Sequence, residues 1–230
     1  MELTGHYRHE LKYEISLGGA YALARRLSAV MQPDPHVDKM GRYRIRSIYF
    51  DNLYDKALRE KLDGVQLREK FRIRYYNDDV SHLTLEKKIK HNDLCMKVSA
   101  PVSQADCRRL LNGDLSWMTD DPSELVRELY CKMRAQQLRP RVLVSYVRTP
   151  YVYAPGNVRV TFDTEIRTSL FAQKFLTPEV HDISAADTPQ TQILEVKFDA
   201  YLPDGIASLL QMGNLRQQAF SKYAACRRFG

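Results

Sequence analysis

Charged and apolar residues alternate along several segments of this chain, and this alternation constrains the fold more than any other feature. In residues Val65–Asn77, the cations Arg68, Lys70, Arg72 and Arg74 occupy every second position. Most of the positions between them carry Leu, Phe, Ile and Tyr, with one Glu. Since successive side chains of a β-strand point to opposite faces, the segment predicts a strand with one basic face and one apolar face.

Three further segments repeat the pattern: His82–His91, Val158–Thr168 and Thr191–Ala200. Their charged positions on one face are Glu86, Lys88 and Lys90 in the first, Arg159, Asp163, Glu165 and Arg167 in the second, and Glu195 and Lys197 in the third. An ordinary antiparallel sheet with one face in water is the simplest explanation of such a pattern. A solvated face is expected to carry more Ser, Thr, Gln and Asn and fewer Arg and Lys, so the charged faces favour a shared lumen.

Eight segments in all predict strands, and short turns rich in Asn, Asp, Gly and Pro favour antiparallel pairing. The predicted strands are Tyr7–Ile15, Tyr43–Asp51, Val65–Asn77, His82–His91, Leu94–Pro101, Arg141–Ala154, Val158–Thr168 and Thr191–Ala200. The predicted helices are Leu17–Met31, Leu53–Leu62, Ser103–Leu111, Ser123–Gln137, Gly205–Met212 and Gln217–Arg228. Since these amphipathic helices need an apolar surface to pack on, we expect them outside the sheet, with the charged faces turned inward.

The predicted fold is therefore α+β: an eight-stranded antiparallel β-barrel that forms a charged tunnel, with helices packed on its outside. No repeat, linker or low-complexity block divides the sequence, so residues 1–230 are expected to form a single domain. The 44% hydrophobic and 27% charged composition excludes a disordered or fibrous chain. The four cysteines lack zinc-ligand spacing, and we find neither a signal peptide nor a run of about 18 apolar residues. We expect a cytoplasmic protein without a transmembrane segment.

The chain carries 35 Lys and Arg against 28 Asp and Glu, a net charge of +7 that favours an anionic partner. Buried cations without a partner are costly, so the basic faces predict a bound anion, and Arg and Lys suit the oxygens of a triphosphate or a longer phosphate chain. The carboxylates in the same lumen have two interpretations, as ligands of Mg²⁺ or Mn²⁺ or as ion-pair partners. Glu195 is the strongest metal-ligand candidate, followed by Glu86, Asp163 and Glu165.

Eight short runs stand out along nearly the whole chain. They are Arg8-His9-Glu10-Leu11-Lys12-Tyr13, Arg44-Ile45-Arg46-Ser47-Ile48-Tyr49-Phe50-Asp51, Lys70-Phe71-Arg72-Ile73-Arg74-Tyr75, Leu85-Glu86-Lys87-Lys88, Tyr146-Val147-Arg148, Arg159-Val160-Thr161-Phe162-Asp163, Leu194-Glu195-Val196-Lys197 and Phe220-Ser221-Lys222-Tyr223. In this order they resemble the polyphosphate polymerase (VTC) domain of the CYTH-like superfamily of triphosphate tunnel metalloenzymes. The combination is far more specific than any one run.

The resemblance implies a tunnel that holds polyphosphate while a metal-bound carboxylate positions the reacting triphosphate. It places phosphate binding on Lys12, Arg72, Arg74, Lys88, Lys97, Tyr146, Arg148, Arg159, Ser221 and Lys222. It places catalytic roles on Arg72, Arg74, Lys88, Arg148, Arg159 and Glu195, with Glu195 as the ligand of a Mn or Mg divalent cation. The final helix near Ser221 is implied to be a C-terminal plug of the tunnel.

Two positions depart from the family pattern. The wider superfamily often begins with Glu-x-Glu-x-Lys, where this chain has Arg8-x-Glu10-x-Lys12. One expected metal ligand is therefore replaced, which favours the polymerase branch over the triphosphatase branch. Just before Ser221, the family's polymerases can carry a second Lys where this chain has Ala219.

The leading functional prediction is a metal-dependent phosphoryltransferase, a polyphosphate polymerase that transfers the γ-phosphoryl group of ATP to a growing polyphosphate chain. ATP or another triphosphate and polyphosphate are the expected partners, and no nucleic acid is expected. The first alternative is a metal-dependent triphosphate or tripolyphosphate hydrolase, in which water accepts the phosphoryl group. The second is a non-catalytic module that binds polyphosphate or nucleic acid.

Overall fold

The computed structural model of the protein describes residues 6–178, 180–185, 191–211 and 215–228. Within these ranges ten strands form one sheet, together with six α-helices and three short 3₁₀ helices. The strands are β1 (Arg8–Ser16), β2 (Gln32–Pro33), β3 (Tyr43–Asp51), β4 (Leu67–Tyr76), β5 (Asp79–His91), β6 (Leu94–Val102), β7 (Arg139–Tyr153), β8 (Val158–Ser169), β9 (Ile183–Ser184) and β10 (Thr191–Phe198). The helices are α1 (Leu17–Leu27), α2 (Lys56–Leu62), α3 (Gln104–Leu111), α4 (Glu124–Ala135), α5 (Asp204–Leu210) and α6 (Lys222–Arg227), and the 3₁₀ helices are η1 (Ser116–Met118), η2 (Pro155–Asn157) and η3 (Ala172–Lys174).

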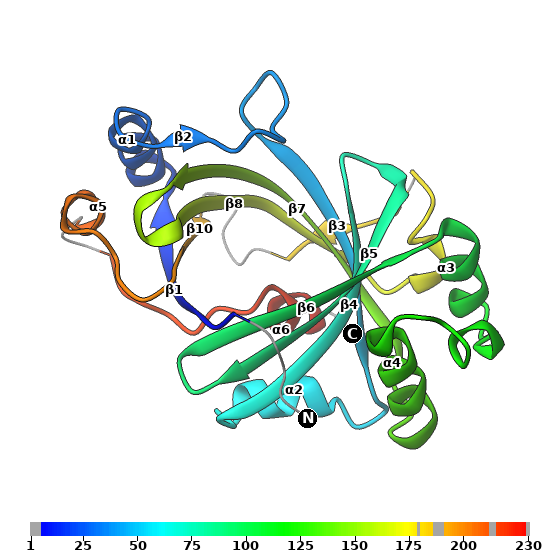
Figure 1. The fold of residues 1–230 in the computed structure, drawn as a ribbon. Helices are drawn as coiled ribbons and strands as arrows, with labels where there is room; N and C mark the ends of the chain where they lie inside the picture. Colours follow the sequence, from blue (N-terminus) through cyan, green and yellow to red (C-terminus); the bar gives the residue numbers. More distant parts are fainter. Residues whose placement is uncertain (1–5, 179, 186–190, 212–214, 229–230) are drawn as a thin grey trace.

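Eight of the strands form a closed ring of antiparallel pairings (Figure 1). The order around the ring is β7-β3-β4-β5-β6-β1-β10-β8, and β8 pairs in turn with β7. All eight predicted strands are present, with each end within three residues of its predicted position. The other two strands, β2 and β9, were not predicted. Each has two residues, and β2 pairs with β7 while β9 pairs with β8. The α+β class is confirmed.

A two-residue turn explains why β5 begins at Asp79 instead of at His82. Asn77 and Asp78 have φ angles of 51° and 60°, in the left-handed region. A hairpin turn with positive φ at both central residues matches the twist of antiparallel strands, and Asn and Asp tolerate this conformation better than most residues. The pairing of β4 with β5 therefore extends to the turn itself.

The apolar faces of the ring strands point outward and carry the helices, as the alternation predicted. On one flank, Phe71 and Ile73 of β4 belong to an apolar cluster with Leu110 of α3 and Leu129 of α4. On the opposite flank, an equivalent cluster joins β1, β8 and β10 to α1 and α5. Figure 1 shows these two pairs of helices on opposite sides of the ring. The outer core thus turns the remaining faces of the strands toward the interior.

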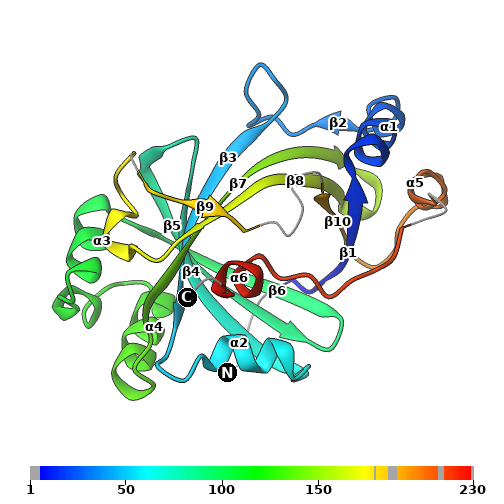
Figure 2. The ribbon, with the colours of Figure 1, turned by 180° about the vertical axis from the view of Figure 1, so that it is seen from behind.

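The interior of the ring has an apolar part and a charged part. In the apolar part, Ile45, Val144 and Ile193 from three ring strands pack against Tyr223 and Cys226 of α6. Figure 2 shows α6 within the outline of the ring, as expected for a C-terminal helix that fills the interior. The charged part lies beside α6, because Ser221, Lys222 and Tyr223 also line the cavity described below.

The predicted bounds of the last helix were wrong: α6 begins at Lys222, not at Gln217. Gln217 forms an isolated β-bridge with Tyr13, and the backbone N–H of Gln218 donates to the carbonyl oxygen of Lys12. These residues are extended because they pair with β1, which lies far away in the sequence. Ser221 then caps the helix by accepting from the backbone N–H of Ala224.

The other five predicted helices are present, with shifted ends. Ser16 and Ser103 cap α1 and α3, as predicted. The predicted helix Leu53–Leu62 begins only at Lys56, because the side chains of Asp51 and Asn52 accept backbone N–H groups at its start. In the last predicted helix before α6, Met212 lies outside the described residues. No helix in the described ranges combines the length and the apolar character that a membrane span requires.

One predicted member of the charged face, Glu165, does not reach the interior. Its φ angle is 51°, and the register between β7 and β8 shifts between Ser145 and Val147. This irregularity breaks the two-residue alternation, so Ile166 faces the interior and Glu165 is exposed. Arg167 is also on the outside, where it pairs with Asp182 at 2.6 Å. The proposed metal-ligand role of Glu165 is therefore wrong.

Candidate functional site

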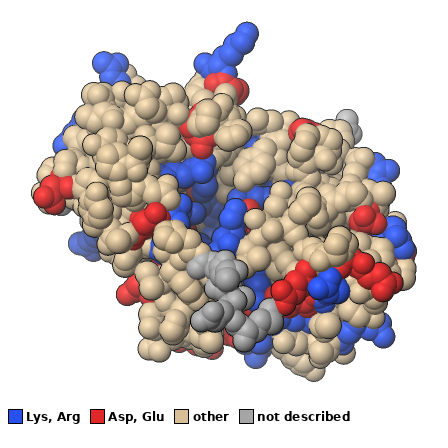
Figure 3. Space-filling model, in the orientation of Figure 1, with Lys and Arg blue, Asp and Glu red and all other residues tan. Residues whose placement is uncertain are grey.

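The charged part of the ring interior is a cavity of about 880 Å³. Among the described residues, fourteen Lys and Arg side chains line it: Arg8, Lys12, Lys61, Arg68, Lys70, Arg72, Arg74, Lys88, Lys90, Lys97, Arg148, Arg159, Lys197 and Lys222. Only three acidic residues of the described ranges share the wall, Glu10, Asp93 and Glu195. Figure 3 shows Lys and Arg gathered in a hollow of this face of the molecule. The cavity therefore suits a polyanion.

The structure brings every residue to which the family resemblance assigned phosphate binding, catalysis or metal binding to this one cavity. Its wall includes Lys12, Arg72, Arg74, Lys88, Lys97, Tyr146, Arg148, Arg159, Glu195, Ser221 and Lys222. They come from β1, β4, β5, β6, β7, β8, β10, α6 and the residue before α6. The ring pairing explains this convergence, because each strand presents every second residue to the interior. Their roles in binding and catalysis stay predictions.

Glu86 is an ion-pair partner behind the wall, the second of its two interpretations. It is 2% exposed, and its carboxylate lies 2.6 Å from Nη2 of Arg72 and 2.9 Å from Nζ of Lys97. Arg74 is also within 3.6 Å. Burial by itself would raise the pKa of Glu86, but these three cations outweigh it and lower the pKa. Glu86 thus holds cations of β4 and β6 in place.

Asp163 has the same role on the opposite wall. It is fully buried and accepts two hydrogen bonds from Arg148, from Nε at 2.7 Å and from Nη2 at 2.8 Å. Lys222 of α6 makes a further close ion pair with it. Burial would raise the pKa of Asp163, but Arg148 and Lys222 lower it. Asp163 therefore links α6 to the ring through charge.

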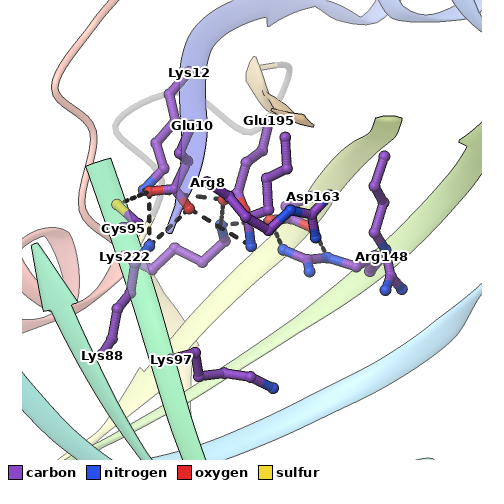
Figure 4. Close-up of polar contacts among 12 residues, drawn as sticks. Arg8, Glu10, Lys12, Lys88, Cys95, Lys97, Arg148, Asp163, Glu195 and Lys222 are labelled. Carbon is purple, nitrogen blue, oxygen red and sulfur yellow. Dashed lines mark hydrogen bonds and ion pairs between the residues drawn. The ribbon is translucent and has the colours of Figure 1, made fainter. Parts of the chain in front are cut away.

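Glu10 and Glu195 are the two carboxylates held among lysines inside the cavity (Figure 4). Nζ of Lys88 lies 2.7 Å from Glu10, and Nζ of Lys197 lies 2.7 Å from Glu195. Lys12 lies between the carboxylates, at 3.5 Å from Glu10 and 3.9 Å from Glu195. Burial would raise both pKa values, but the surrounding lysines lower them, so both groups are ionised.

Glu10 was missed as a site residue, although the sequence contained the signal. It lies two positions before Lys12 on the same strand, so the alternation places both on one face. Two positions before Glu10, where the superfamily often has an acid, Arg8 also lines the cavity. Arg8 pairs with Asp199 at 2.9 Å, so this position supplies a cation, not a metal ligand.

Glu10 and Glu195 have the donor chemistry that a divalent cation needs, but they do not form a complete metal site by themselves. No group of three or more His, Cys, Asp or Glu side chains in the described ranges is arranged to hold a metal ion. Glu10 and Glu195 supply carboxylate oxygens close to the same lysines. Mg²⁺ commonly uses one or two carboxylates together with substrate phosphates, so phosphate oxygens would complete this donor set.

Lys70 is a second residue that the sequence analysis did not assign to the site. The alternation does place it on the same basic strand face as Arg72 and Arg74. Its Nζ donates to Oγ of Ser221 at 3.4 Å and lies 5.0 Å from the centre of the Tyr223 ring. Burial, followed by the positive charges of its neighbours, lowers the pKa of Lys70 to about 7.

Arg159 is held at the wall by residues from outside its own strand. Its Nη2 lies 2.6 Å from Oδ2 of Asp34 and donates to the hydroxyl of Tyr43, also at 2.6 Å. Asp34 lies between β2 and β3, in a segment for which the sequence predicted no element. The pair depends on tertiary contact, so no local pattern could have revealed it.

Comparisons with known proteins give both a family and a fold. The sequence matches the family model described as the VTC domain over residues 7–229. Comparison with curated proteins gave no match. Among solved structures, the PH1819 protein from Pyrococcus horikoshii is 11% identical and has a TM-score of 0.50, with 97% of this chain and 99% of that chain covered. A candidate adenylate cyclase from Bacillus halodurans is 15% identical, with 91% and 88% covered and a TM-score of 0.50. At these identities the two structures show a shared fold alone.

Proposed function

The chain belongs to the VTC domain family, and from this premise we propose that it is an enzyme, a polyphosphate polymerase that transfers the γ-phosphoryl group of ATP to the end of a polyphosphate chain. The observation that carries the proposal is the cavity with fourteen cations in the described part of the chain. A polyphosphate chain and the triphosphate of ATP have the same chemistry, so one basic cavity can receive both. The orthophosphate ester groups of other substrates would need far fewer cations.

In this reaction a terminal oxygen of the acceptor chain attacks the γ-phosphorus of ATP. The bond from the γ-phosphorus to the bridging oxygen breaks, and ADP leaves with the electron pair of that bond. Such transfers pass through a loose transition state, for which the protein supplies position and charge. Arg72, Arg74 and Lys88 are the cations that we assign to the phosphate oxygens on one wall, and Arg148 and Arg159 those on the other.

The buried carboxylates make this arrangement rigid before substrate arrives. Glu86 holds Arg72, and Asp163 holds Arg148 and Lys222, each through short contacts. Preorganised charges stabilise a transition state more effectively than charges that must move into place. A bound Mg²⁺ or Mn²⁺, held by Glu195 and Glu10, would supply further positive charge to the phosphate oxygens.

Product length tests the proposal. The purified protein would be incubated with ATP and Mn²⁺ or Mg²⁺, and the products separated on a gel that resolves phosphate chains. A ladder that lengthens with time is the expected result. Release of orthophosphate alone would favour the triphosphate hydrolase, and tight binding of polyphosphate with no turnover under either metal would favour the binding module.

A control variant makes the test specific to the cavity. Lys39 is exposed and does not line the cavity, so Lys39→Ala should leave chain growth unchanged. Arg72→Ala should abolish growth, since its guanidinium contacts Glu86 and lines the cavity. Equal growth by the two variants would remove Arg72 from the mechanism.

A further inference from the structure

The cations of the cavity divide into two sets. In the described part of the chain, ten of the fourteen have a carboxylate oxygen within 4.0 Å, the ion-pair limit. The other four have no carboxylate partner among the described residues: Lys61, Arg68, Lys70 and Lys90. Asp93 also lines the cavity but makes no ion pair with any of these four. Carboxylates thus neutralise part of the positive charge in one region of the cavity and none of it in the other.

The four unpaired cations lie together on one edge of the ring, which we call the β4–β5 rim. Lys61 is in the last turn of α2, Arg68 and Lys70 are in the first half of β4, and Lys90 is next to the last residue of β5. The strand register places Arg68 directly opposite Lys90. Figure 1 shows α2 beside the beginning of β4.

Like charges in this arrangement repel one another. Arg68 faces Lys90 and, two residues further, Lys70 faces Lys88. Like charges directly opposite on neighbouring strands are destabilising. The pKa of Lys61 is lowered by burial and then by nearby cations, Arg68 first among them. A fold that keeps such a cluster without carboxylates gains from an anion that enters it.

We infer that the β4–β5 rim is a binding subsite for the phosphate units of a linear polyphosphate that extend beyond those held by the paired cations. The inference rests on the proposed function and adds a distinction between ligands. A triphosphate can be held by the cations around Glu86, Glu10 and Asp163. A longer chain has further negative charges, and the rim supplies cations that no side chain of the described protein already neutralises.

Paired binding measurements test the subsite. Calorimetric titration would give the affinity of tripolyphosphate and of medium-chain polyphosphate for the wild-type protein and for Lys61→Ala, Arg68→Ala and Lys90→Ala, singly and combined. We expect each single change to weaken long-chain binding about two- to fivefold, the range for partly exposed charges. Tripolyphosphate affinity should stay as in the wild type. The combined variant should also show a weaker dependence of long-chain affinity on salt.

Two controls separate the rim from the rest of the cavity. Arg72→Ala should weaken the binding of both ligands about tenfold or more, because it removes a charge-assisted contact. Lys90→Arg keeps the charge and should retain long-chain affinity. Since the changes to Ala relieve repulsion, the variants should melt at the wild-type temperature or above it, which a melting curve would verify.

The outcomes distinguish the subsite from the proposed function. The subsite is overturned if the rim variants weaken the binding of both ligands equally. It is also overturned if they weaken the binding of neither. If the rim variants weaken only the binding of the long chain but the protein makes no polymer from ATP, the subsite is supported and the proposed polymerase function is contradicted. If polymer grows normally and long-chain binding is unchanged in the combined variant, only the subsite fails. A wild-type protein that binds neither ligand overturns both.

Discussion

At the scale of single residues, the protonation of Lys70 should depend on whether a phosphate chain occupies the cavity. Burial and the cations Lys12, Arg68, Lys88 and Lys61 lower its pKa to about 7. It contacts the hydroxyl of Ser221, the residue before α6, and the ring of Tyr223 in α6, neither of which carries a formal negative charge. A phosphate chain would supply the missing charge and raise the pKa, so binding should take up a proton above pH 7.

The affinity for polyphosphate should therefore fall as pH rises through 7. Below pH 7 the amine of Lys70 is already protonated, whereas above pH 7 the free protein must acquire that proton. Lys70→Arg keeps its charge throughout, so its affinity should fall less between about pH 6 and about pH 9. Titrations of both proteins across this range would test it. Parallel pH profiles for the two proteins would contradict the role of Lys70.

Glu195 is the residue at which binding and catalysis can be separated. It forms an ion pair with Lys197 inside the cavity, so Glu195→Gln should lower the melting temperature whatever else the carboxylate does. If it also binds the metal, the variant should need at least about tenfold more Mg²⁺ or Mn²⁺ for half-maximal turnover, while polyphosphate still binds. Turnover across a metal titration, beside a melting curve, gives both quantities.

Glu86→Gln is the matched control for this experiment. Glu86 is also buried and also pairs with cations of the cavity wall, so the melting temperature should fall in the same way. Its carboxylate lies behind Arg72 and Lys97, and the metal requirement should stay at the wild-type value. Equal metal requirements for the two variants would exclude Glu195 as a ligand.

At the scale of elements, α6 is anchored more firmly than its six residues suggest. Asp51 of β3 is fully buried and accepts from the hydroxyl of Tyr223 in α6, as well as from two backbone N–H groups of α2. Arg227 of α6 pairs with Asp55 at 2.7 Å. These contacts set the position of Lys222, the cation that α6 contributes to the cavity.

Tyr223→Phe should therefore affect both stability and substrate binding. Removing the hydroxyl leaves a buried carboxylate with one hydrogen bond fewer, at a cost of about 1–3 kcal/mol in the free energy of unfolding. A less firmly held α6 should raise KM for ATP more than it lowers kcat. Chemical denaturation and steady-state kinetics would measure the two effects. Tyr54→Phe, at an exposed tyrosine, is the control that should change neither.

The elements also show which parts of the fold local sequence can reveal. All eight ring strands were predicted because alternation is a local property, and the capping serines Ser16 and Ser103 were recognised for the same reason. The start of α6 was not, because Gln217 pairs with Tyr13, which lies at the other end of the chain. The irregular backbone at Glu165 broke the alternation on which its assignment depended.

At the scale of the whole molecule, the ring brings the inward faces of eight strands together around one interior, part of which is the basic cavity. The sequence predicted that the charged faces meet, since the helices needed the apolar faces. It could not predict which carboxylate neutralises which cation, because pairs such as Asp163 with Lys222 join elements distant in sequence. The sequence also could not predict the β4–β5 rim, because the clustering of its cations depends on the register that sets Arg68 opposite Lys90.

A ligand that balances this charge should stabilise the entire domain. Tripolyphosphate at a hundred times its dissociation constant would add about 2.7 kcal/mol to the free energy of unfolding. For a domain of this size, that corresponds to a rise in melting temperature of roughly 5–10 °C. Thermal denaturation with and without ligand would measure it. Sodium sulfate at matched ionic strength is the control, and an equal rise in sulfate would show a general salt effect instead of cavity binding.

The position of β1 in the ring has a consequence for how the molecule is made. Among the ring strands β1 comes first in the sequence, yet it pairs with β6 through only two residues, Arg8 and His9. Its main partner is β10, which it meets along eight residue pairs from His9–Phe198 to Ser16–Thr191. The ring can close only after most of the chain has been translated, and such long-range pairing slows folding. Closure of the ring, and of the cavity inside it, therefore depends on pairing between the first and the last of its strands.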